Sequence, residues 1–201
     1  MALEKPRIGV LALQGGVREH AEMLTRAADD VDVREVRVPA DLDGLAGIVL
    51  PGGESTTIGK LLRESGLLAP LRSRIHDGLP AYGTCAGMIL LARTVDDAPE
   101  SALGAMNIAV RRNAFGSQRD SFEEDLTIAG MPGGPLHGVF IRAPSIEAAG
   151  PDVEVLARLK DGTPAAVRQG RLLASAFHPE LGQDPRFHAL FLAMCFAACG
   201  A

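Results

Sequence analysis

The sequence is short of cysteines, basic clusters and long apolar runs, and each shortage excludes a class of protein. Among its 201 residues only Cys85, Cys195 and Cys199 are cysteines. An odd number without framework spacing does not fit a disulfide-stapled secreted domain. The formal net charge is −5 and no segment gathers Lys and Arg, which disfavours nucleic acid binding as the main role. No apolar stretch approaches the roughly 18 residues that span a bilayer.

The N-terminal segment also lacks the apolar core and the small-residue cleavage site of a signal peptide. We therefore expect a cytoplasmic protein, because a reducing compartment lets a lone cysteine serve as a reactive thiolate. No repeat, low-complexity segment or long linker divides the chain. The length suits one compact core, so residues 1–201 are expected to form a single domain.

Strand and helix patterns alternate over the first half of the chain. Short apolar runs predict strands at 8–13, 31–38, 47–50 and 80–83. Apolar residues at three- and four-residue steps predict helices from 17, from a cap at Ser55 or Thr56 to 65, at 68–77 and at 86–92. Such alternation favours a parallel sheet with helices on both faces.

The pattern changes after about residue 104. We predict strands at 107–111, 126–129, 138–142, 153–159, 165–169 and 172–177. Residues 160–163 (Lys-Asp-Gly-Thr) are typical of a hairpin turn, so the last three strands should form an antiparallel meander. A terminal helix is expected from 185. A gap in order is expected at 96–101 or at 130–135, because both segments have loop-like compositions.

Cys85 has the sequence context of a nucleophile. It lies in Gly-Thr-Cys-Ala-Gly at 83–87, between a predicted strand and a predicted helix, which is the spacing of a nucleophile elbow. The helix N-terminus would stabilise a thiolate, and the backbone N–H of Ala86 could face a developing oxyanion. The alternative is a buried structural cysteine beside a glycine turn. That alternative is preferred for Cys195 and Cys199, which have no metal-binding neighbours.

His178 and Glu180 supply a candidate base and the group that orients it. His178 ends a predicted strand in Phe-His-Pro-Glu at 177–180, and residues two apart in an extended segment face the same side. The carboxyl ends of parallel strands gather functional groups, and Cys85 and His178 both lie at such ends. His20, His76 and His188 lie on predicted helices and are interpreted as structural or solvated, while His137 is ambiguous.

A glycine loop at 51–57 (Pro-Gly-Gly-Glu-Ser-Thr-Thr) follows a strand and opens a helix. It could cradle a phosphate, but it lacks the Lys-Ser/Thr ending of a P-loop. A second oxyanion donor fits better, because glycine N–H groups can approach the reacting carbonyl without obstruction by a side chain. A plain turn with a helix cap remains the simple alternative.

Five segments together resemble the glutaminase subunits of pyridoxal 5′-phosphate synthase. They are 11–15 (Leu-Ala-Leu-Gln-Gly), 51–57, 83–88 (Gly-Thr-Cys-Ala-Gly-Met), 112–116 (Arg-Asn-Ala-Phe-Gly) and 177–181 (Phe-His-Pro-Glu-Leu). The elbow and His-Pro-Glu are shared by all class I glutamine amidotransferases, whereas the glycine loop and the segment 112–116 are more specific. The resemblance implies the three-layer α/β fold of that superfamily. Two positions depart from the family pattern, Tyr82 in place of Phe and Ser117 in place of Arg.

The resemblance also implies roles for individual residues. Cys85, His178 and Glu180 would be the catalytic triad, and Gly53 and Ala86 would form the oxyanion hole. The residues implied to bind glutamine are Gly53, Glu54, Ser55, Arg112, Ile141 and Arg142. An Arg fork does match the α-carboxylate of glutamine, although without the resemblance both arginines are ordinary surface charges.

The implied reaction is hydrolysis of L-glutamine to glutamate and ammonia, with no metal or organic cofactor. The implied partner is the synthase subunit of pyridoxal 5′-phosphate synthase, in a large hetero-oligomer. Three alternatives stay open: the glutaminase of another pathway such as histidine biosynthesis, a non-catalytic binding subunit of the same fold, and a cysteine-elbow stress protein.

Overall fold

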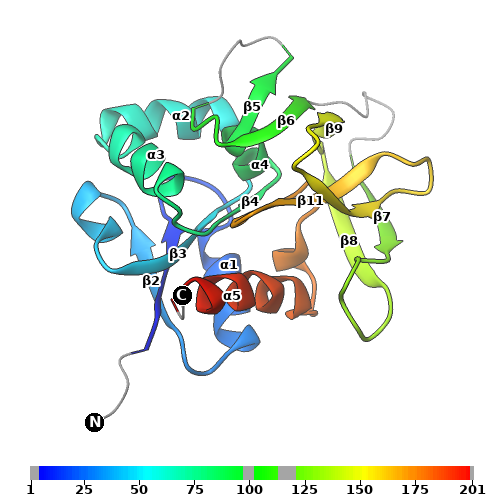
Figure 1. Ribbon diagram of the computed structural model, residues 1–201, viewed down its shortest axis with the longest axis horizontal. Coiled ribbons are helices and arrows are strands. Elements are labelled where there is room, and N and C mark those ends of the chain that lie inside the picture. Colours follow the sequence, from blue (N-terminus) through cyan, green and yellow to red (C-terminus); the bar gives the residue numbers. More distant parts are fainter. Residues whose placement is uncertain (1–4, 97–101, 113–120, 200–201) are drawn as a thin grey trace.

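A computed structural model describes residues 5–96, 102–112 and 121–199 and has a seven-stranded central sheet (Figure 1). The strand order across the sheet is β10-β11-β12-β4-β3-β1-β2. The bounds of these strands are β1 Arg7–Leu11, β2 Asp32–Val36, β3 Leu45–Leu50, β4 Ala81–Thr84, β10 Glu154–Arg158, β11 Pro164–Gln169 and β12 Leu172–Ser175.

The strands from β12 to β2 run parallel, and β10 and β11 add an antiparallel edge. The parallel part comes from the buried apolar runs of the first half of the chain. The antiparallel part is the predicted meander, in which Gly162 donates to the carbonyl of Leu159 in the turn between β10 and β11. β12 pairs with β4 in parallel, with Ser175 opposite Thr84. This pairing brings the segments that follow both strands, residues 85 and 178 included, to one end of the sheet.

Helices cover both faces of this sheet, as predicted. Their bounds are α1 Val17–Ala27, α2 Ser55–Glu64, α3 Leu68–His76, α4 Ala86–Leu91 and α5 Arg186–Cys199. Helices α1 and α5 pack together on one face, and α2, α3 and α4 lie on the other (Figure 1). Two short 3-10 helices, η1 at Pro39–Leu42 and η2 at Pro179–Leu181, complete the helical elements of the described residues.

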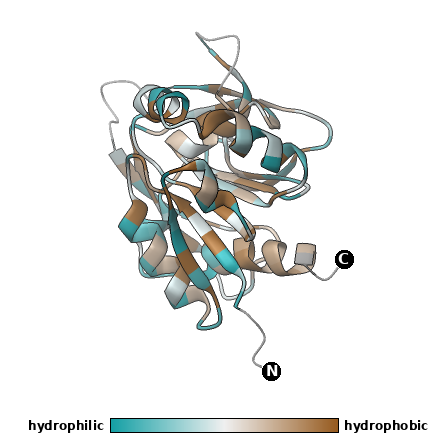
Figure 2. Ribbon diagram, turned by 90° about the vertical axis from the view of Figure 1, so that its left-hand side faces the viewer, coloured by the Kyte–Doolittle hydropathy of each residue, from teal (hydrophilic) through white to brown (hydrophobic). Residues whose placement is uncertain are grey.

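The core lies between the sheet and these helices. Strand side chains such as Ile8, Ile48 and Leu50 are fully buried, and so are Phe187 and Phe191 of α5. Helix α5, next to the C-terminus in Figure 2, is coloured tan to brown over most of its length. Each buried Phe or Leu contributes roughly 1.5–3 kcal/mol, so this apolar helix secures one face of the sheet.

Two smaller sheets account for the errors in the strand predictions. One contains β5 (Ala92–Val95), β6 (Met106–Arg111) and β9 (Ser145–Ala149), and the other contains β7 (Ser121–Leu126) and β8 (Leu136–Ile141). Strands β5 and β9 were not predicted from the sequence. The strand predicted at 126–129 is wrong, because β7 ends at Leu126. The acidic sequence of β7 has little apolar signal, and its pairing with β8 holds it in a strand.

Of the two predicted gaps in order, residues 97–101 lie outside the described residues. Residues 130–135 are described and form turns between β7 and β8, with Gly130, Gly133 and Gly134 at positive φ. No helix in the described residues is long and apolar enough to cross a membrane.

His137, the ambiguous histidine, lies on β8. Its Nδ1 is 2.9 Å from Asp125 Oδ1 and its Nε2 is 3.1 Å from Glu123 Oε2, both on β7. Hydrogen bonds to these two carboxylates raise the pKa of His137 above 6.5. The protonated ring therefore links the two strands of the hairpin.

Replacing His137 with glutamine should lower the free energy of unfolding at low pH only. The folded-state pKa is raised, so the stabilisation is complete below the unfolded value near 6.5 and is lost as pH rises through the folded pKa. The side chain is 53% exposed, so solvent screening limits the difference to about 0.5 kcal/mol. Urea unfolding of wild type and variant at pH 5.5 and pH 9 measures this difference in the free energy of unfolding. The same difference at the two pH values would contradict the ion-pair explanation.

Candidate active site

The strand-to-helix turn at Cys85 has the strained geometry of a nucleophile elbow. Cys85 lies between the last residue of β4 and the first of α4, with φ 48° and ψ −102°. A non-glycine residue rarely adopts a positive φ unless its surroundings impose it. A Cβ on Gly87 would lie 1.9 Å from the Leu50 carbonyl oxygen, and one on Gly83 would lie 2.5 Å from the Gly87 carbonyl. Both flanking glycines are therefore required by close backbone approach.

His178 and Glu180 lie together beside this elbow. The Nδ1 of His178 is 2.7 Å from Glu180 Oε1, and the backbone N–H of His178 donates to the Val139 carbonyl at 2.8 Å. The contact was predicted, but its assumed geometry was wrong. Glu180 lies in the 3-10 helix η2, not in an extended segment, because Pro179 begins a helical turn. That turn brings the carboxylate back to the imidazole.

The electrostatics of His178 favour its protonated form. Burial lowers the pKa of His178, but hydrogen bonds to Cys85 and Glu180 outweigh burial and raise it to about 10. Glu180 is 6% exposed and its pKa is lowered, since interactions with His20 and His178 outweigh the effect of its burial. An imidazolium next to Cys85 stabilises a thiolate, which is the nucleophilic form of the side chain.

The glycine loop lies directly against the histidine. A Cβ on Gly52 would be 2.5 Å from His178 Cε1 and 3.6 Å from Cys85 Cβ. The loop is held by Gly16, whose N–H donates to the Gly52 carbonyl at 3.1 Å. It is also held by Gln14, whose Oε1 accepts from the Glu54 N–H at 2.9 Å. The segment after β1 therefore fixes the loop beside the elbow.

Glu54 is the N-cap of α2, whereas the sequence analysis expected Ser55 or Thr56. Its carboxylate accepts hydrogen bonds from the backbone N–H groups of Thr56 and Thr57, at 2.9 and 2.7 Å. The hydroxyl of Thr57 also donates to it, and together these bonds lower the pKa of Glu54 to about 2. The side chain of Glu54 is longer than that of Ser or Thr. From one residue before Ser55 it therefore reaches the backbone N–H groups that a Ser or Thr cap would bind.

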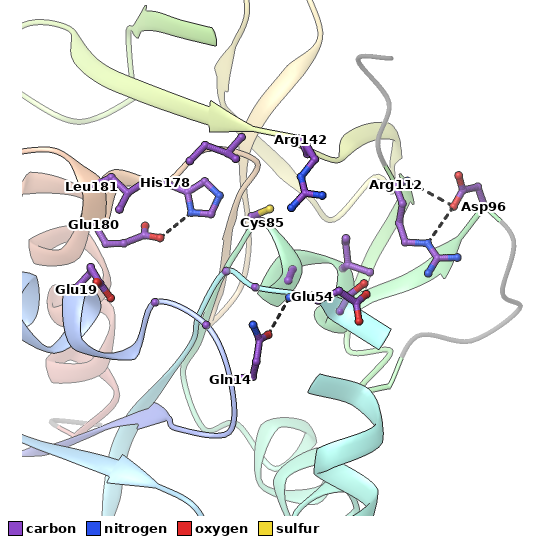
Figure 3. Close-up of a pocket in the computed structure, with 18 residues that line it drawn as sticks. Gln14, Glu19, Glu54, Cys85, Asp96, Arg112, Arg142, His178, Glu180 and Leu181 are labelled. Atoms are coloured by element: carbon purple, nitrogen blue, oxygen red, sulfur yellow. Dashed lines mark hydrogen bonds and ion pairs between the residues drawn. The ribbon is translucent and has the colours of Figure 1, made fainter. Parts of the chain in front are cut away.

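A cavity of about 750 Å³ lies over the elbow (Figure 3). Every residue predicted for the site lines it: Cys85, His178, Glu180, Gly53, Glu54, Ser55, Ala86, Arg112, Ile141 and Arg142. Their individual roles stay predictions. The cavity is large enough for an amino acid and leaves one side open to solvent.

The two predicted arginines enter the cavity from the ends of different strands. Arg142 follows β8 with φ 43°, and Figure 3 shows its guanidinium group directed toward Cys85. Arg112 follows β6, with Nη1 3.5 Å from Thr56 Oγ1 and Nε 4.0 Å from Asp96. Residues 113–116 of the predicted family segment, and Ser117, lie outside the described residues. The two guanidinium groups give the cavity a positive side suited to a carboxylate.

One buried side chain next to the triad was not predicted from the sequence to lie there. His20, which was interpreted as structural or solvated, is fully buried with its Nε2 3.5 Å from Glu180 Oε2. His188 is also fully buried, whereas His76 is exposed. The helical pattern of 17–28 places His20 on the buried face of α1, which was the available signal. Tyr82, which stands where the family pattern has Phe, is buried in β4, and its hydroxyl is 3.0 Å from Ser175 Oγ.

The described residues contain no group of three or more His, Cys, Asp or Glu side chains arranged to hold a metal ion. Cys195 is buried in the core, in agreement with its structural interpretation. In the described part of the chain the polar groups that line the cavity are a thiol, an imidazole, a hydroxyl, a side-chain amide, carboxylates and guanidinium groups.

A family model describing the SNO glutamine amidotransferases matches residues 10–197. The chain belongs to the SNO glutamine amidotransferase family. It is similar to the pyridoxal 5′-phosphate synthase subunit PdxT of Acidothermus cellulolyticus, with 58% identity over 200 residues, 96% of this chain and 95% of that protein. The PdxT subunit of Frankia alni is 60% identical over 190 residues, 93% and 94% of the two chains.

Solved structures agree with this membership of the SNO family. A crystal structure described as a glutamine amidotransferase has a TM-score of 0.88 and 52% identity, covering 94% of this chain and 98% of that chain. A structure of PurLQS from Thermotoga maritima has a TM-score of 0.72 at 18% identity, covering 97% of this chain and 99% of the matched chain, and shows a shared fold alone. The predicted family and three-layer α/β fold are confirmed.

Replacing Glu180 with alanine should reduce the rate of glutamate release by about 10²–10⁴-fold, because His178 would lose its orienting acceptor and its negative neighbour. The far-ultraviolet circular dichroism spectrum should stay unchanged, since Glu180 lies in a short 3-10 helix at the sheet end. Steady-state kinetics with glutamine measure the loss. Full activity of the folded variant would remove Glu180 from the triad.

Proposed function

We propose that this chain hydrolyses L-glutamine to L-glutamate and ammonia, with Cys85 as nucleophile, His178 as acid and base, and Glu180 as its orienting group. The observation that carries the proposal is the position of Cys85, on a strained elbow beside a histidine whose Nδ1 lies 2.7 Å from Glu180 Oε1. A cavity with guanidinium groups on its wall supports an amino acid substrate.

In the proposed reaction the Cys85 thiolate attacks the side-chain amide carbon of glutamine. The backbone N–H groups of Gly53 and Ala86 would receive the negative charge that develops on the oxygen. His178 gives its proton to the departing ammonia, which leaves a glutamyl thioester on Cys85. His178 then takes a proton from water, which attacks the thioester and releases glutamate.

Substrate orientation would come from charge. Arg112 and Arg142 would hold the α-carboxylate, while Gly53, Glu54, Ser55 and Ile141 would line the rest of the glutamine site. The Glu54 carboxylate stays ionised, because its hydrogen bonds in the α2 cap lower its pKa to about 2. It can therefore attract the α-ammonium group while it caps the helix. These steps use no metal or organic cofactor.

The ammonia would pass to a synthase subunit that makes pyridoxal 5′-phosphate. Relatives that match over most of this chain are named as subunits of that synthase, which supports such a partner. Free ammonia becomes ammonium in neutral water, so delivery within a complex avoids waste of glutamine. The large hetero-oligomer, the single-domain organisation of residues 1–201 and a cytoplasmic location stay predictions.

The test measures glutamate release from glutamine by the purified chain, alone and mixed with a pyridoxal 5′-phosphate synthase subunit. The proposal expects activity that rises strongly with the synthase subunit. Equal activity with and without it would keep the glutaminase and contradict the assigned partner. No glutamate under either condition, from a chain that binds the synthase subunit on gel filtration, would favour the non-catalytic alternative.

A further inference from the structure

Behind Glu180, on the side away from the cavity, a row of buried polar side chains runs into the core. His20 of α1 has its Nε2 2.9 Å from Thr84 Oγ1 and 3.5 Å from Glu180 Oε2. Its Nδ1 is 2.9 Å from Nε2 of His188 on α5. All of these side chains are at most 6% exposed. Burying a polar group this deeply lowers the stability of the fold unless the group is paired. The presence of these polar side chains in the core therefore calls for a functional explanation.

Burial favours the neutral form of both histidines of this row. Burial lowers the pKa of His20, and burial together with repulsion from His20 lowers the pKa of His188 well below 6.5. Each ring therefore carries one N–H, and the contact between them uses the proton of one ring and the lone pair of the other.

The unpaired atoms decide which ring donates. Among the described residues His188 Nδ1 finds no hydrogen-bond partner, and a buried lone pair is tolerated better than a buried N–H without an acceptor. His188 therefore carries its proton on Nε2 and donates it to His20 Nδ1. The proton of His20 is then on Nε2, which faces Thr84 Oγ1 and Glu180 Oε2. In the opposite arrangement, a lone pair of His20 would face the carboxylate and His188 would bury an unsatisfied donor.

The two N–H dipoles consequently point the same way, with their positive ends toward Glu180. Within the described part of the chain Glu180 Oε2 has no hydrogen-bond partner, and His20 Nε2 approaches it at 3.5 Å, whereas Oε1 is engaged by His178. We infer that His20, supported by His188, is a positioning residue that keeps the Glu180 carboxylate ionised and aimed at His178. The inference rests on the proposed function, because the position of Glu180 matters for catalysis only if His178 works on glutamine.

The other groups around Glu180 do not replace this donor. Those that face it or lie next to it are His178 and Leu181 from its own segment, Glu19 and His20 from α1, and Tyr82 from β4. Glu19 is negative and exposed, and the hydroxyl of Tyr82 is hydrogen-bonded to Ser175. On the buried side of the carboxylate the nearby polar group is therefore His20, whose Nε2 lies 3.5 Å from Oε2 and 2.9 Å from Thr84 Oγ1.

The test compares His20→Leu, which fills the space without a donor, with His20→Gln, whose amide N–H₂ can reach the position of Nε2. For the complex with the synthase subunit, we expect kcat to fall about ten- to a hundred-fold in His20→Leu with KM for glutamine nearly unchanged. The acid limb of the pH profile should move up by about one unit. His20→Gln should recover most of kcat and return the acid limb most of the way to its wild-type position. Met23→Leu, at another buried position of α1, is the packing control and should change neither.

A second readout does not depend on glutaminase activity. Alkylation of Cys85 by iodoacetamide in the full chain reports the thiolate, so its pH profile should move to higher pH in His20→Leu and return in His20→Gln. If wild-type protein releases no glutamate, the alkylation profiles alone still decide the role of His20. In His188→Leu the alkylation profile should also move to higher pH, but by less. This variant provides the test if His20→Leu fails to fold. Unchanged pH profiles in these variants, or Gln no better than Leu, would overturn the inference.

Discussion

Replacing Cys85 with alanine should abolish glutamate release, with a loss of at least about a thousand-fold, while the protein keeps its fold. The expected loss is this large because Cys85 is the thiol of the cavity and the one nucleophile placed beside His178. The Ser55 hydroxyl also lines the cavity, but no hydrogen bond joins it to a base among the described residues, so it should not replace the thiolate. The measurement is glutamate production in the complex, followed over hours to reach slow rates.

Cys195→Ala is the matched control for this variant. Cys195 is fully buried on α5, outside the cavity, so its loss should cost about 1 kcal/mol of stability and leave the rate unchanged. If Cys85→Ala retained activity within about ten-fold of wild type, the nucleophile would be another group and the proposed mechanism would be wrong.

Replacing Gly87 with alanine should destabilise the protein by about 3 kcal/mol and lower the yield of active complex. The new Cβ would lie 1.9 Å from the Leu50 carbonyl oxygen and 2.8 Å from its carbonyl carbon. Both atoms belong to the last residue of β3 in the seven-stranded sheet, so neither can move without shifting the glycine loop that follows. Thermal and urea unfolding measure the loss of stability.

Gly59→Ala provides the control for Gly87→Ala. Gly59 lies inside α2, and a Cβ there would meet only ordinary contacts, 3.7 Å to Arg63 Nη1 and 3.9 Å to Ala102 Cβ. Helix propensity then predicts a gain of about 0.5–1 kcal/mol. Equal stability of the two variants would show that the close approach of α4 to β3 does not constrain the elbow.

The parallel half of the fold could be predicted from the sequence because its signals are local. Buried runs such as 47–50 and amphipathic helices such as 17–28 each specify their own element, and the glycine turns between them separate the elements. The acidic β7 could not be predicted in this way. Its Ser-Phe-Glu-Glu-Asp-Leu sequence is held as a strand by β8, a partner that no local pattern reveals.

The residues of the site also divide into those that local sequence motifs predict and those that depend on tertiary contacts. Cys85, His178 and Glu180 could be found because two short motifs place them at strand ends, and the parallel pairing of β4 with β12 brings those ends together. The role of Glu54 as the cap of α2 and the contact of His20 with Glu180 could not be found. Each depends on tertiary geometry, since a buried face of α1 gives no indication of which polar atom lies opposite.

The most direct test of the central claim is covalent labelling with a glutamine analogue that carries a diazoketone in place of the side-chain amide. Peptide mass spectrometry locates the label in the complex with the synthase subunit. The account predicts one adduct, on Cys85, formed in step with loss of glutamate release and slowed by excess glutamine. Labelling at another residue, or full glutaminase activity after complete modification of Cys85, would contradict it.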